Sequence, residues 1–372
     1  MSVEFISLVG VNASTELHPL PERGLDVGYF RRYARTLEDH GFDRVLLPYT
    51  SSGIDPFVLA GAISQVTERL RPVVALRPNT MHPTVAAKAL ATLDQLTDGR
   101  AAVHLIAGGD TREQAREGDR LGKDERYDRA EEYLHVLRRA WSEPDAFDHA
   151  GRHYAFEDFR SDVRPVAGTI PISFGGSSPA AYRVGGAHAD AFGLWGEPLA
   201  ETRDQIDALD REARAAGRLD RPTPWVTFRP IVAATEELAW EKARRTLAAV
   251  QDVASAQARW REDEGAVGSR PENVGSQRLL DLAERGELHD RALWTPLATA
   301  TGARGASTAL VGTPETVAAA LVDYVDLGVG QLTIRGYDNL DDAIDYGRYV
   351  IPLVREELEH RARTRPERQL SA

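Results

Sequence analysis

Cysteine is absent from the 372-residue sequence, and methionine occurs only as Met1 and Met81. A chain without cysteine forms no disulfide, no thiolate metal site and no cysteine nucleophile. The histidines are scattered without the His-Glu-x-x-His spacing of zinc enzymes, and no Gly-x-Ser-x-Gly turn of the serine hydrolases occurs. The sequence therefore disfavours metal chemistry and hydrolysis through a serine or cysteine nucleophile.

Long apolar runs and an excess of positive charge are also missing. The net charge of −12 argues against broad binding to nucleic acid or to an anionic membrane. No run has the length and apolarity of a membrane span, and the chain opens on strand-like residues without the basic segment of a signal peptide. We therefore expect a cytoplasmic protein, in which an anionic substrate would need a local cluster of arginines.

What the sequence does contain is an alternation of short apolar runs and longer amphipathic segments. The runs predicted as strands are 3–9, 44–48, 71–76, 101–106, 170–174, 190–194, 225–233 and 331–336. The segments predicted as helices are 27–40, 55–67, 82–96, 125–141, 179–187, 199–216, 236–250, 313–327 and 340–360, with a hairpin expected within 149–159.

This alternation predicts one α/β domain over 1–360, because no linker interrupts it. About eight strand–helix units favour a (β/α)8 TIM barrel. An open doubly wound sheet is the alternative, although no Gly-x-Gly-x-x-Gly follows the first strand. In a barrel the polar segment 255–305, which shows no clear period, would cover the mouth as a mobile lid, and 361–372 would form a charged flexible tail.

The stretch 171–182 joins a predicted strand to a predicted helix through a tight turn. Gly175 and Gly176 let the backbone approach a ligand closely, and Ser177 or Ser178 can cap the helix. Free N–H groups and the positive end of the helix dipole at such a turn suit a phosphate. A capped turn without a ligand is the alternative interpretation.

Arginines follow several predicted strands and would gather at the mouth of a barrel. They are Arg77, Arg229, Arg304 (within 255–305) and Arg335. Planar guanidinium groups match phosphate, carboxylate and sulfonate oxygens, although each of these arginines could instead pair with a carboxylate of the protein.

Aromatic residues and histidines complete the predicted mouth. Trp195 could wall a flat ring, and Tyr337 could donate to an oxyanion, although both could equally be packing residues. His18, His82 and His104 could reach the mouth, and His104 is expected to be packed inside the barrel. These features suit an enzyme that uses a phosphorylated cofactor.

Seven motifs occur in the order in which a known family carries them. They are Leu76-Arg77-Pro78, the segment 82–100, Glu125-Arg126-Tyr127, Phe-Gly-Gly-Ser-Ser at 174–178, Leu-Trp-Gly-Glu-Pro at 194–198, the segment 308–314 and Gly336-Tyr337. Through them the chain resembles the bacterial-luciferase-like flavin monooxygenases over roughly 3–355. Within that family it looks most similar to the two-component alkanesulfonate monooxygenases.

The resemblance implies a barrel that receives reduced FMN (FMNH2) from a separate NAD(P)H-dependent flavin reductase and uses O2 as co-substrate. In the alkanesulfonate branch the oxygenated flavin attacks R–CH2–SO3−, and the products include an aldehyde and sulfite. The resemblance also implies a homodimer or a homotetramer. The residues that it assigns to the cofactor are Arg77, Ala107, Gly108, Tyr127, Gly176, Ser177 and Ser178.

The substrate side of the site departs from the family pattern. Arg229, in Thr227-Phe228-Arg229, stands where the family usually has the histidine of Arg-x-His, and Asn339 replaces another histidine. Gly53 stands near the position of a frequent cysteine, and the lid arginine is displaced by one position to Arg304.

We therefore expect an FMNH2-dependent monooxygenase acting on a small organosulfonate or a related organosulfur compound. Its catalytic and substrate-binding residues would be Arg229, Arg304, Tyr337 and Trp195. The alternatives are the same chemistry on a sulfone, an alkane or an amine, an F420-dependent oxidoreductase, and a non-catalytic flavin-binding barrel.

Overall fold

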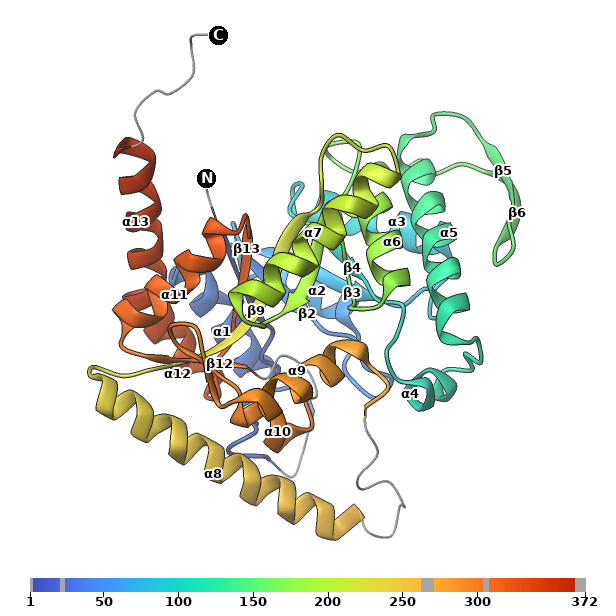
Figure 1. The fold of residues 1–372 in the computed structure, drawn as a ribbon. Helices are drawn as coiled ribbons and strands as arrows, with labels where there is room; N and C mark the ends of the chain where they lie inside the picture. The colour runs from blue at the N-terminus through green and yellow to red at the C-terminus, as the bar shows by residue number, and fades with distance from the viewer. Residues whose placement is uncertain (1–2, 21–23, 262–270, 304–307, 365–372) are drawn as a thin grey trace.

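Eight parallel strands close into a barrel in this structure, a computed structural model that describes residues 3–20, 24–261, 271–303 and 308–364 (Figure 1). The barrel strands are β1 (Glu4–Leu8), β2 (Arg44–Leu47), β3 (Arg71–Leu76), β4 (Ala102–Leu105), β7 (Ile172–Gly175), β8 (Ala191–Trp195), β9 (Thr223–Val232) and β13 (Gln331–Ile334). They pair in this order, and β13 returns to β1, which closes the ring. The predicted (β/α)8 barrel is confirmed, and the open doubly wound sheet is wrong.

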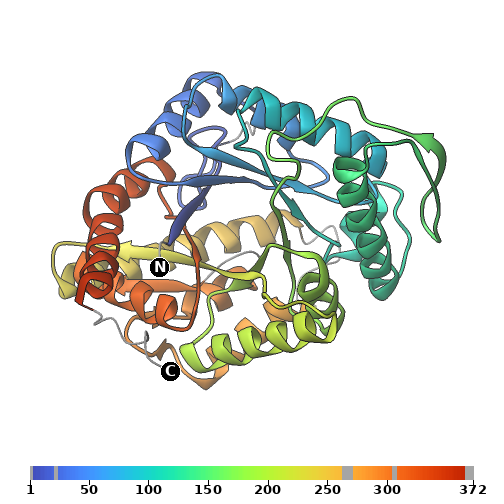
Figure 2. The same cartoon turned by 90° about the horizontal axis from the view of Figure 1, so that it is seen from above.

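Helices surround the ring, as the view along the barrel shows (Figure 2). The outer helices are α1 (Val27–Asp39), α2 (Pro56–Ser64), α3 (Pro83–Leu96), α5 (Lys123–Ser142), α6 (Pro179–His188), α7 (Leu199–Ala215) and α11 (Pro314–Asp326). The closing run comprises α12 (Asn339–Asp345), the π-helical turn η2 (Tyr346–Val350) and α13 (Ile351–Thr364). The predicted hairpin is confirmed as β5 (Phe147–Ala150) and β6 (Ala155–Phe159). None of the helices in the described part of the chain combines the length and the apolarity needed to cross a membrane.

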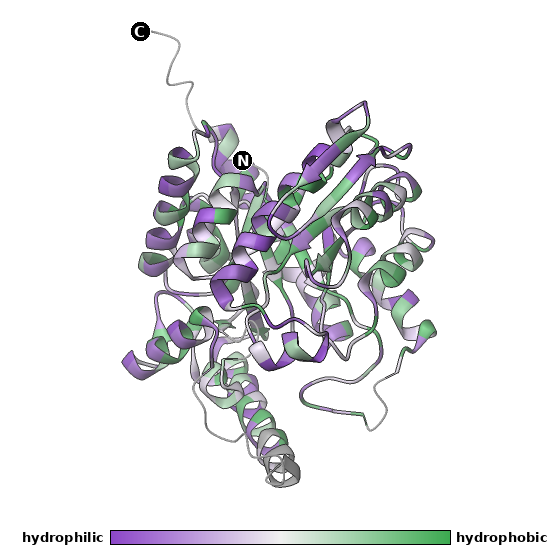
Figure 3. Cartoon of the chain, turned by 90° about the vertical axis from the view of Figure 1, so that its right-hand side faces the viewer, coloured by the Kyte–Doolittle hydropathy of each residue, from purple (hydrophilic) through white to green (hydrophobic). Residues whose placement is uncertain are grey.

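Local sequence signals explain where these helices begin and which face they bury. The side chains of Asp26, Asp55, Ser178 and Thr313 accept backbone N–H groups at the starts of α1, α2, α6 and α11. Along α1 the buried residues recur at helical spacing, and the helices present hydrophilic and hydrophobic faces side by side (Figure 3).

A long excursion between β9 and β13 differs from the prediction. It comprises α8 (Glu236–Arg261), α9 (Val274–Arg285), β10 (Leu288–His289), β11 (Leu293–Trp294), α10 (Pro296–Thr301) and β12 (Ala309–Gly312). The predicted end of the α8 helix near 250 is wrong: beyond Val250 the described side chains are largely exposed, so no apolar stripe marks the helix, while its alanine-rich composition favours it. Likewise 271–303 is not without structure but holds two helices and two short strands, and β12 pairs in parallel with β9.

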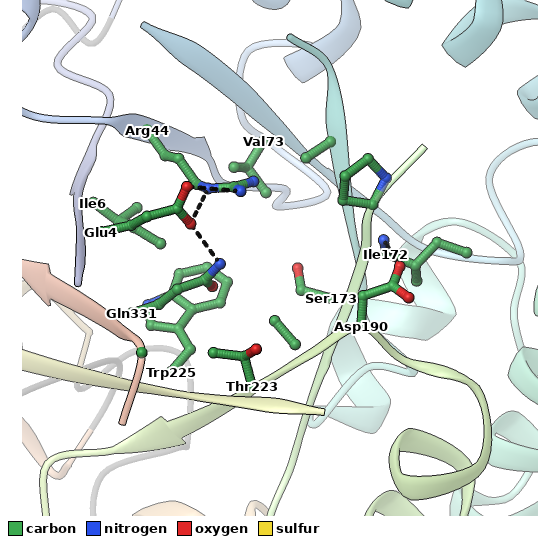
Figure 4. A pocket seen from close by; sticks show the side chains of 14 residues that line it. Glu4, Ile6, Arg44, Val73, Ile172, Ser173, Asp190, Thr223, Trp225 and Gln331 are labelled. Carbon is green, nitrogen blue, oxygen red and sulfur yellow. Dashed lines mark hydrogen bonds and ion pairs between the residues drawn. The ribbon is translucent and has the colours of Figure 1, made fainter. Parts of the chain in front are cut away.

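A cavity of about 360 Å³ lies among the first residues of the strands, at the N-terminal end of the barrel (Figure 4). Its charged groups have partners: Glu4 accepts from Arg44 at 2.8 Å and from Gln331 at 2.9 Å, and Asp190 accepts from Arg138 at 2.8 Å and from the backbone N–H of Ile172 at 2.7 Å. None of the buried polar atoms that lack a partner within the described residues belongs to its lining. The carboxylates of this cavity are thus already bound by groups of the protein.

The packing of α6 on the barrel gives a direct test of the fold. A Cβ atom added at Gly185 would lie 2.2 Å from Cε2 of Phe192, whereas one added at Gly61 in α2 would meet nothing within 4 Å. We expect Gly185→Ala to lower the free energy of unfolding by about 1–3 kcal/mol through overpacking. The control Gly61→Ala should raise it by up to about 1 kcal/mol through helix propensity. Urea unfolding measures both, and a Gly185→Ala variant as stable as the parent would contradict this packing.

Candidate functional site

The C-terminal halves of the strands enclose an accessible space. Successive side chains of a strand point to opposite faces of the sheet. Residues two and four positions further along each strand than a residue that lines the N-terminal cavity therefore also point into the barrel. Nine of these inward residues are partly exposed: Leu8, Leu46, His104, Ile106, Gly175, Gly193, Trp195, Thr227 and Arg335. Ala75, Arg77, Arg229 and Thr333 follow the same alternation and are buried. The outward neighbours Leu47, Leu105, Phe174, Leu194, Phe228 and Ile334 are buried as well. The partial exposure of the inward residues indicates accessible space at the C-terminal mouth, which is where TIM-barrel enzymes carry their active sites. We call it the mouth cavity.

The floor of the mouth cavity is an aromatic layer. The rings of His104 and Trp225 meet edge to face with centroids 5.1 Å apart, and Trp225 Nε1 donates to Thr333 Oγ1 at 2.5 Å. This layer separates the mouth cavity from the cavity at the N-terminal end, which Trp225 also lines. His104 thus lies inside the barrel, as predicted. His82 precedes α3 as its N-cap residue and His18 is exposed on the loop after β1.

His104 is a neutral imidazole with a defined orientation. Burial lowers its pKa to about 4. Its Nδ1 lies 2.9 Å from Ser173 Oγ, and the Ser173 hydroxyl donates to the carbonyl of Val103 at 3.2 Å. This network assigns the proton to Nδ1 and leaves Nε2 as an acceptor. A Cβ at Gly175 or Gly193 would approach Cε1 of His104 to 3.3 or 3.5 Å, so any larger side chain there would fill the space above the ring.

The turn between β7 and α6 forms an anion cradle. Gly176 has φ +146°, and a Cβ on it would lie 2.9 Å from the hydroxyl of Tyr127, so glycine lets the backbone and that phenol approach each other. Ser178 Oγ accepts the N–H of Ala181 at 3.2 Å and caps α6. Ser177 Oγ is buried and has no partner within the described residues. Burial raises the pKa of Tyr127, so its hydroxyl keeps its proton.

An ion cluster occupies the opposite side of the mouth, where β9 and β13 end. Glu16, from the loop after β1, accepts hydrogen bonds from Arg229 and, at 2.7 Å, from Arg335. Arg229 also donates to the carbonyl of Gly336 at 2.8 Å and lies 3.6 Å from the ring centroid of Tyr337. Burial raises the pKa of Tyr337 to about 12, and its hydroxyl is buried without a partner among the described residues.

A second charged group lies at the ends of β3 and β4. Arg77 donates to Glu113 at 2.8 Å and to Glu117 at 3.4 Å, with the Tyr49 ring 5.0 Å away. Glu113 lies in, and Glu117 directly after, the short helix α4 (Thr111–Arg116), which the sequence analysis missed. Its signal was the capping pattern in which Asp110 accepts the N–H of Glu113 at 2.9 Å.

Beside this group, the loop after β4 packs against an amide side chain. Gly108 has φ +90°, and a Cβ on it would lie 1.9 Å from Nε2 of Gln114. The side-chain nitrogen and oxygen of Gln114, like those of Asn79, are buried without partners in the described part of the chain. Ala107 is buried next to Gly108. Buried polar atoms without partners in the described part of the chain thus occur at this mouth, in Asn79 and Gln114.

The N-terminal end of α9 covers the anion cradle. A Cβ on Gly275 would lie 3.0 Å from both Ser177 Oγ and Trp195 Nε1. Glu272 accepts from the N–H of Thr111 at 3.1 Å, and Arg278 donates to Glu197 at 2.8 Å. The described start of α9 therefore lies over the cradle, and a lid formed by 255–305 stays a prediction.

The structure sorts the predicted site residues into separate groups. It brings Tyr127, Gly176, Ser177 and Ser178 together at the cradle, with Trp195 beside it, and places Arg229 and Tyr337 in contact across the mouth. Arg77, Ala107 and Gly108 lie at the ends of β3 and β4, and Arg304 falls outside the described residues. Glu16, Asn79 and Gln114 were not predicted. No group of three or more His, Asp or Glu within the described ranges could hold a metal ion.

The comparisons with known proteins agree with this geometry. The sequence model of the luciferase-like monooxygenase family matches residues 8–331, so the chain belongs to that family. A riboflavin lyase solved with modified FMN and riboflavin has a TM-score of 0.79 and 24% identity, covering 96% of this chain and 92% of its own. An EDTA monooxygenase from Chelativorans sp. BNC1 has a TM-score of 0.77 and 18% identity, and the match covers 96% of this chain and 94% of the EDTA monooxygenase. An F420-dependent secondary alcohol dehydrogenase has a TM-score of 0.69 and 16% identity, and the match covers 95% of this chain and 100% of the dehydrogenase. At these identities the structures establish the fold.

The depressed pKa of His104 predicts a pH dependence of stability. Below its ordinary pKa the unfolded imidazole binds a proton that the folded one, with its pKa of about 4, does not bind, so stability falls as the pH falls through this window. Between about pH 7 and about pH 4.5 the free energy of unfolding should fall by roughly 2–3 kcal/mol more in the parent than in His104→Asn. Urea unfolding at the two pH values measures this difference. Equal losses in the two proteins would contradict it, and exposed His18→Asn is the matched control.

Proposed function

We propose that this protein is a two-component monooxygenase that binds reduced FMN with its phosphate in the anion cradle and its ring in the mouth cavity. The observation that carries the proposal is the buried Ser177 hydroxyl beside Gly176 and the start of α6, which has no partner among the residues that the structure describes. A phosphate would give Ser177 the acceptor it lacks, and the helix N-terminus favours its negative charge. The ring would find apolar walls at Leu8, Leu46 and Ile106, and an acceptor in His104.

The chain's own residues would prepare the site for oxygen chemistry. Bound reduced FMN supplies the electrons with which O2 is activated. Tyr337 keeps its proton up to about pH 12 and offers an unpartnered O–H donor beside Arg229. Gly275 and the start of α9 cover the cradle and limit the access of water, which would otherwise divert the activated oxygen to peroxide. NADH or NADPH would act elsewhere, on a partner flavin reductase, and we propose a homodimer or homotetramer.

For the substrate we propose a small organosulfonate. The balanced reaction is R–CH2–SO3− plus FMNH2 plus O2, giving R–CHO, sulfite, FMN, water and a proton. Arg229 and Arg335 supply the cationic groups that a sulfonate needs. A neutral sulfone or alkane is the second candidate, because both guanidinium groups already donate to Glu16 in this structure.

Removal of the cradle hydroxyls tests the cofactor assignment. We expect Ser177→Ala/Ser178→Ala to weaken FMNH2 binding by about 10–100-fold, since two hydrogen bonds to a charged phosphate are lost. Anaerobic titration followed by tryptophan fluorescence measures the dissociation constant. Ser142→Ala, on the exposed end of α5, is the control. An unchanged affinity in the double variant would place the phosphate elsewhere. Tight binding of reduced F420 but not of FMNH2 would show that the cofactor is F420.

Sulfite release tests the substrate assignment. With a flavin reductase, NADH and FMN, we expect oxygen-dependent release of one sulfite per sulfonate consumed from at least one linear alkanesulfonate, measured with a thiol-reactive dye. Diethyl sulfone and a long-chain alkane serve as neutral comparison substrates. Oxidation of a neutral substrate without sulfite from any sulfonate would contradict the organosulfonate proposal and leave the flavin proposal standing.

A further inference from the structure

Glu16 is the carboxylate that bridges the two arginines at the ends of β9 and β13. Arg229 and Arg335 both donate to it, although they are separated from it by 213 and 319 positions in the chain. Burial alone would raise the pKa of Glu16, but the charges of the two arginines and their hydrogen bonds lower it, so it is ionised. Its side chain is 41% exposed, against 4% for Arg229 and 27% for Arg335. The cationic partners are therefore enclosed, and their counter-ion is open to solvent.

Arg229 has contacts that do not depend on Glu16. Arg229 donates to the Gly336 carbonyl at 2.8 Å and stacks on Tyr337. The Nε atoms of both arginines and the Tyr337 hydroxyl are buried without partners in the described ranges. Burial and the neighbouring charge of Arg229 lower the pKa of Arg335, so this pair of like charges requires an anion between them.

The loop that carries Glu16 is anchored next to it. Leu17 packs against an apolar cluster that includes Tyr337, Ile231 and Trp294. Rotation of the Glu16 side chain would free the guanidinium groups without displacing Leu17. A sulfonate or carboxylate offers the same arrangement of oxygens to two guanidinium groups as the Glu16 carboxylate does.

We propose that Arg229 and Arg335 form a subsite for one anionic group of the substrate, and that Glu16 occupies this subsite as an internal carboxylate which the substrate anion displaces. The proposal rests on the proposed function in taking a sulfonate as that anion. Glu16 thereby sets the substrate class: a neutral ligand leaves it in place, and an anionic ligand competes with it. The cost of displacing Glu16 selects for anions that reach both arginines over those that reach one.

The test compares ligand affinities in the full chain. The probes are 1-butanesulfonate and neutral diethyl sulfone, whose binding is measured by isothermal titration calorimetry with and without bound FMN. We expect Glu16→Gln to tighten 1-butanesulfonate binding by about tenfold and to leave the affinities for diethyl sulfone and FMNH2 unchanged. Glu16→Asp keeps the charge on a shorter side chain and should give an intermediate affinity. Arg335→Gln should weaken sulfonate binding in both the parent and the Glu16→Gln background.

The controls separate this inference from its rivals. Glu157→Gln removes an exposed carboxylate on β6 and should change none of the affinities. Unchanged or weaker sulfonate binding in Glu16→Gln, in protein that still binds FMNH2, would show that Glu16 is a fixed structural counter-ion and would overturn the inference alone. If Glu16→Gln fails to fold, equal sulfonate affinities in Glu16→Asp and the parent would overturn it. Failure of the parent protein to bind FMNH2 would instead overturn the proposed function. The two failures can be told apart because the sulfonate affinity is also measured without flavin.

Discussion

The site depends on two glycines that face the inside of the barrel near the ends of neighbouring strands. A TIM barrel is ordinarily filled by layers of bulky side chains. Here Gly175 and Gly193 stand at inward positions of adjacent strands, beside the imidazole of His104. Neither glycine has a positive φ, so the backbone does not require glycine at these positions. Their effect is instead to leave the volume of a side chain free above the imidazole. The layer of His104 and Trp225 then becomes a floor on which a flat ring could lie.

The rim of this cavity is built from two kinds of polar group. At the cradle and in the loop after β4 the side chains of Ser177 and Gln114 are buried without partners among the described residues, which costs free energy unless a ligand or water completes them. At the ends of β9 and β13 one carboxylate, that of Glu16, lies between the guanidinium groups of Arg229 and Arg335. The first kind suits a cofactor that binds in one way, and the second suits an exchangeable anion. This division matches a protein that takes up a flavin and a separate substrate at one mouth.

Much of the fold could be predicted from the sequence, because the strands and outer helices have clear hydrophobic periods and capping residues. The cradle could be predicted as well, since Gly176 to Ser178 are adjacent in the chain and their chemistry is local. The cluster of Glu16 with Arg229 could not, because the two residues lie far apart in the chain and the loop that carries Glu16 has no period. The end of α8 was missed because its described side chains beyond Val250 are largely exposed. The helix α9 was missed although it buries Leu279 and Leu282 at helical spacing, because the stretch around it is polar and irregular.

The central claim is that one mouth of the barrel binds a flavin through the cradle at the start of α6. A crystal structure of the protein with FMN tests it most directly. The account predicts the phosphate at the N–H groups of Ser177 and Ser178 and the ring above His104 and Trp225. A phosphate bound elsewhere, or FMN in the cavity lined by Glu4 and Arg44 at the opposite end of the barrel, would contradict it.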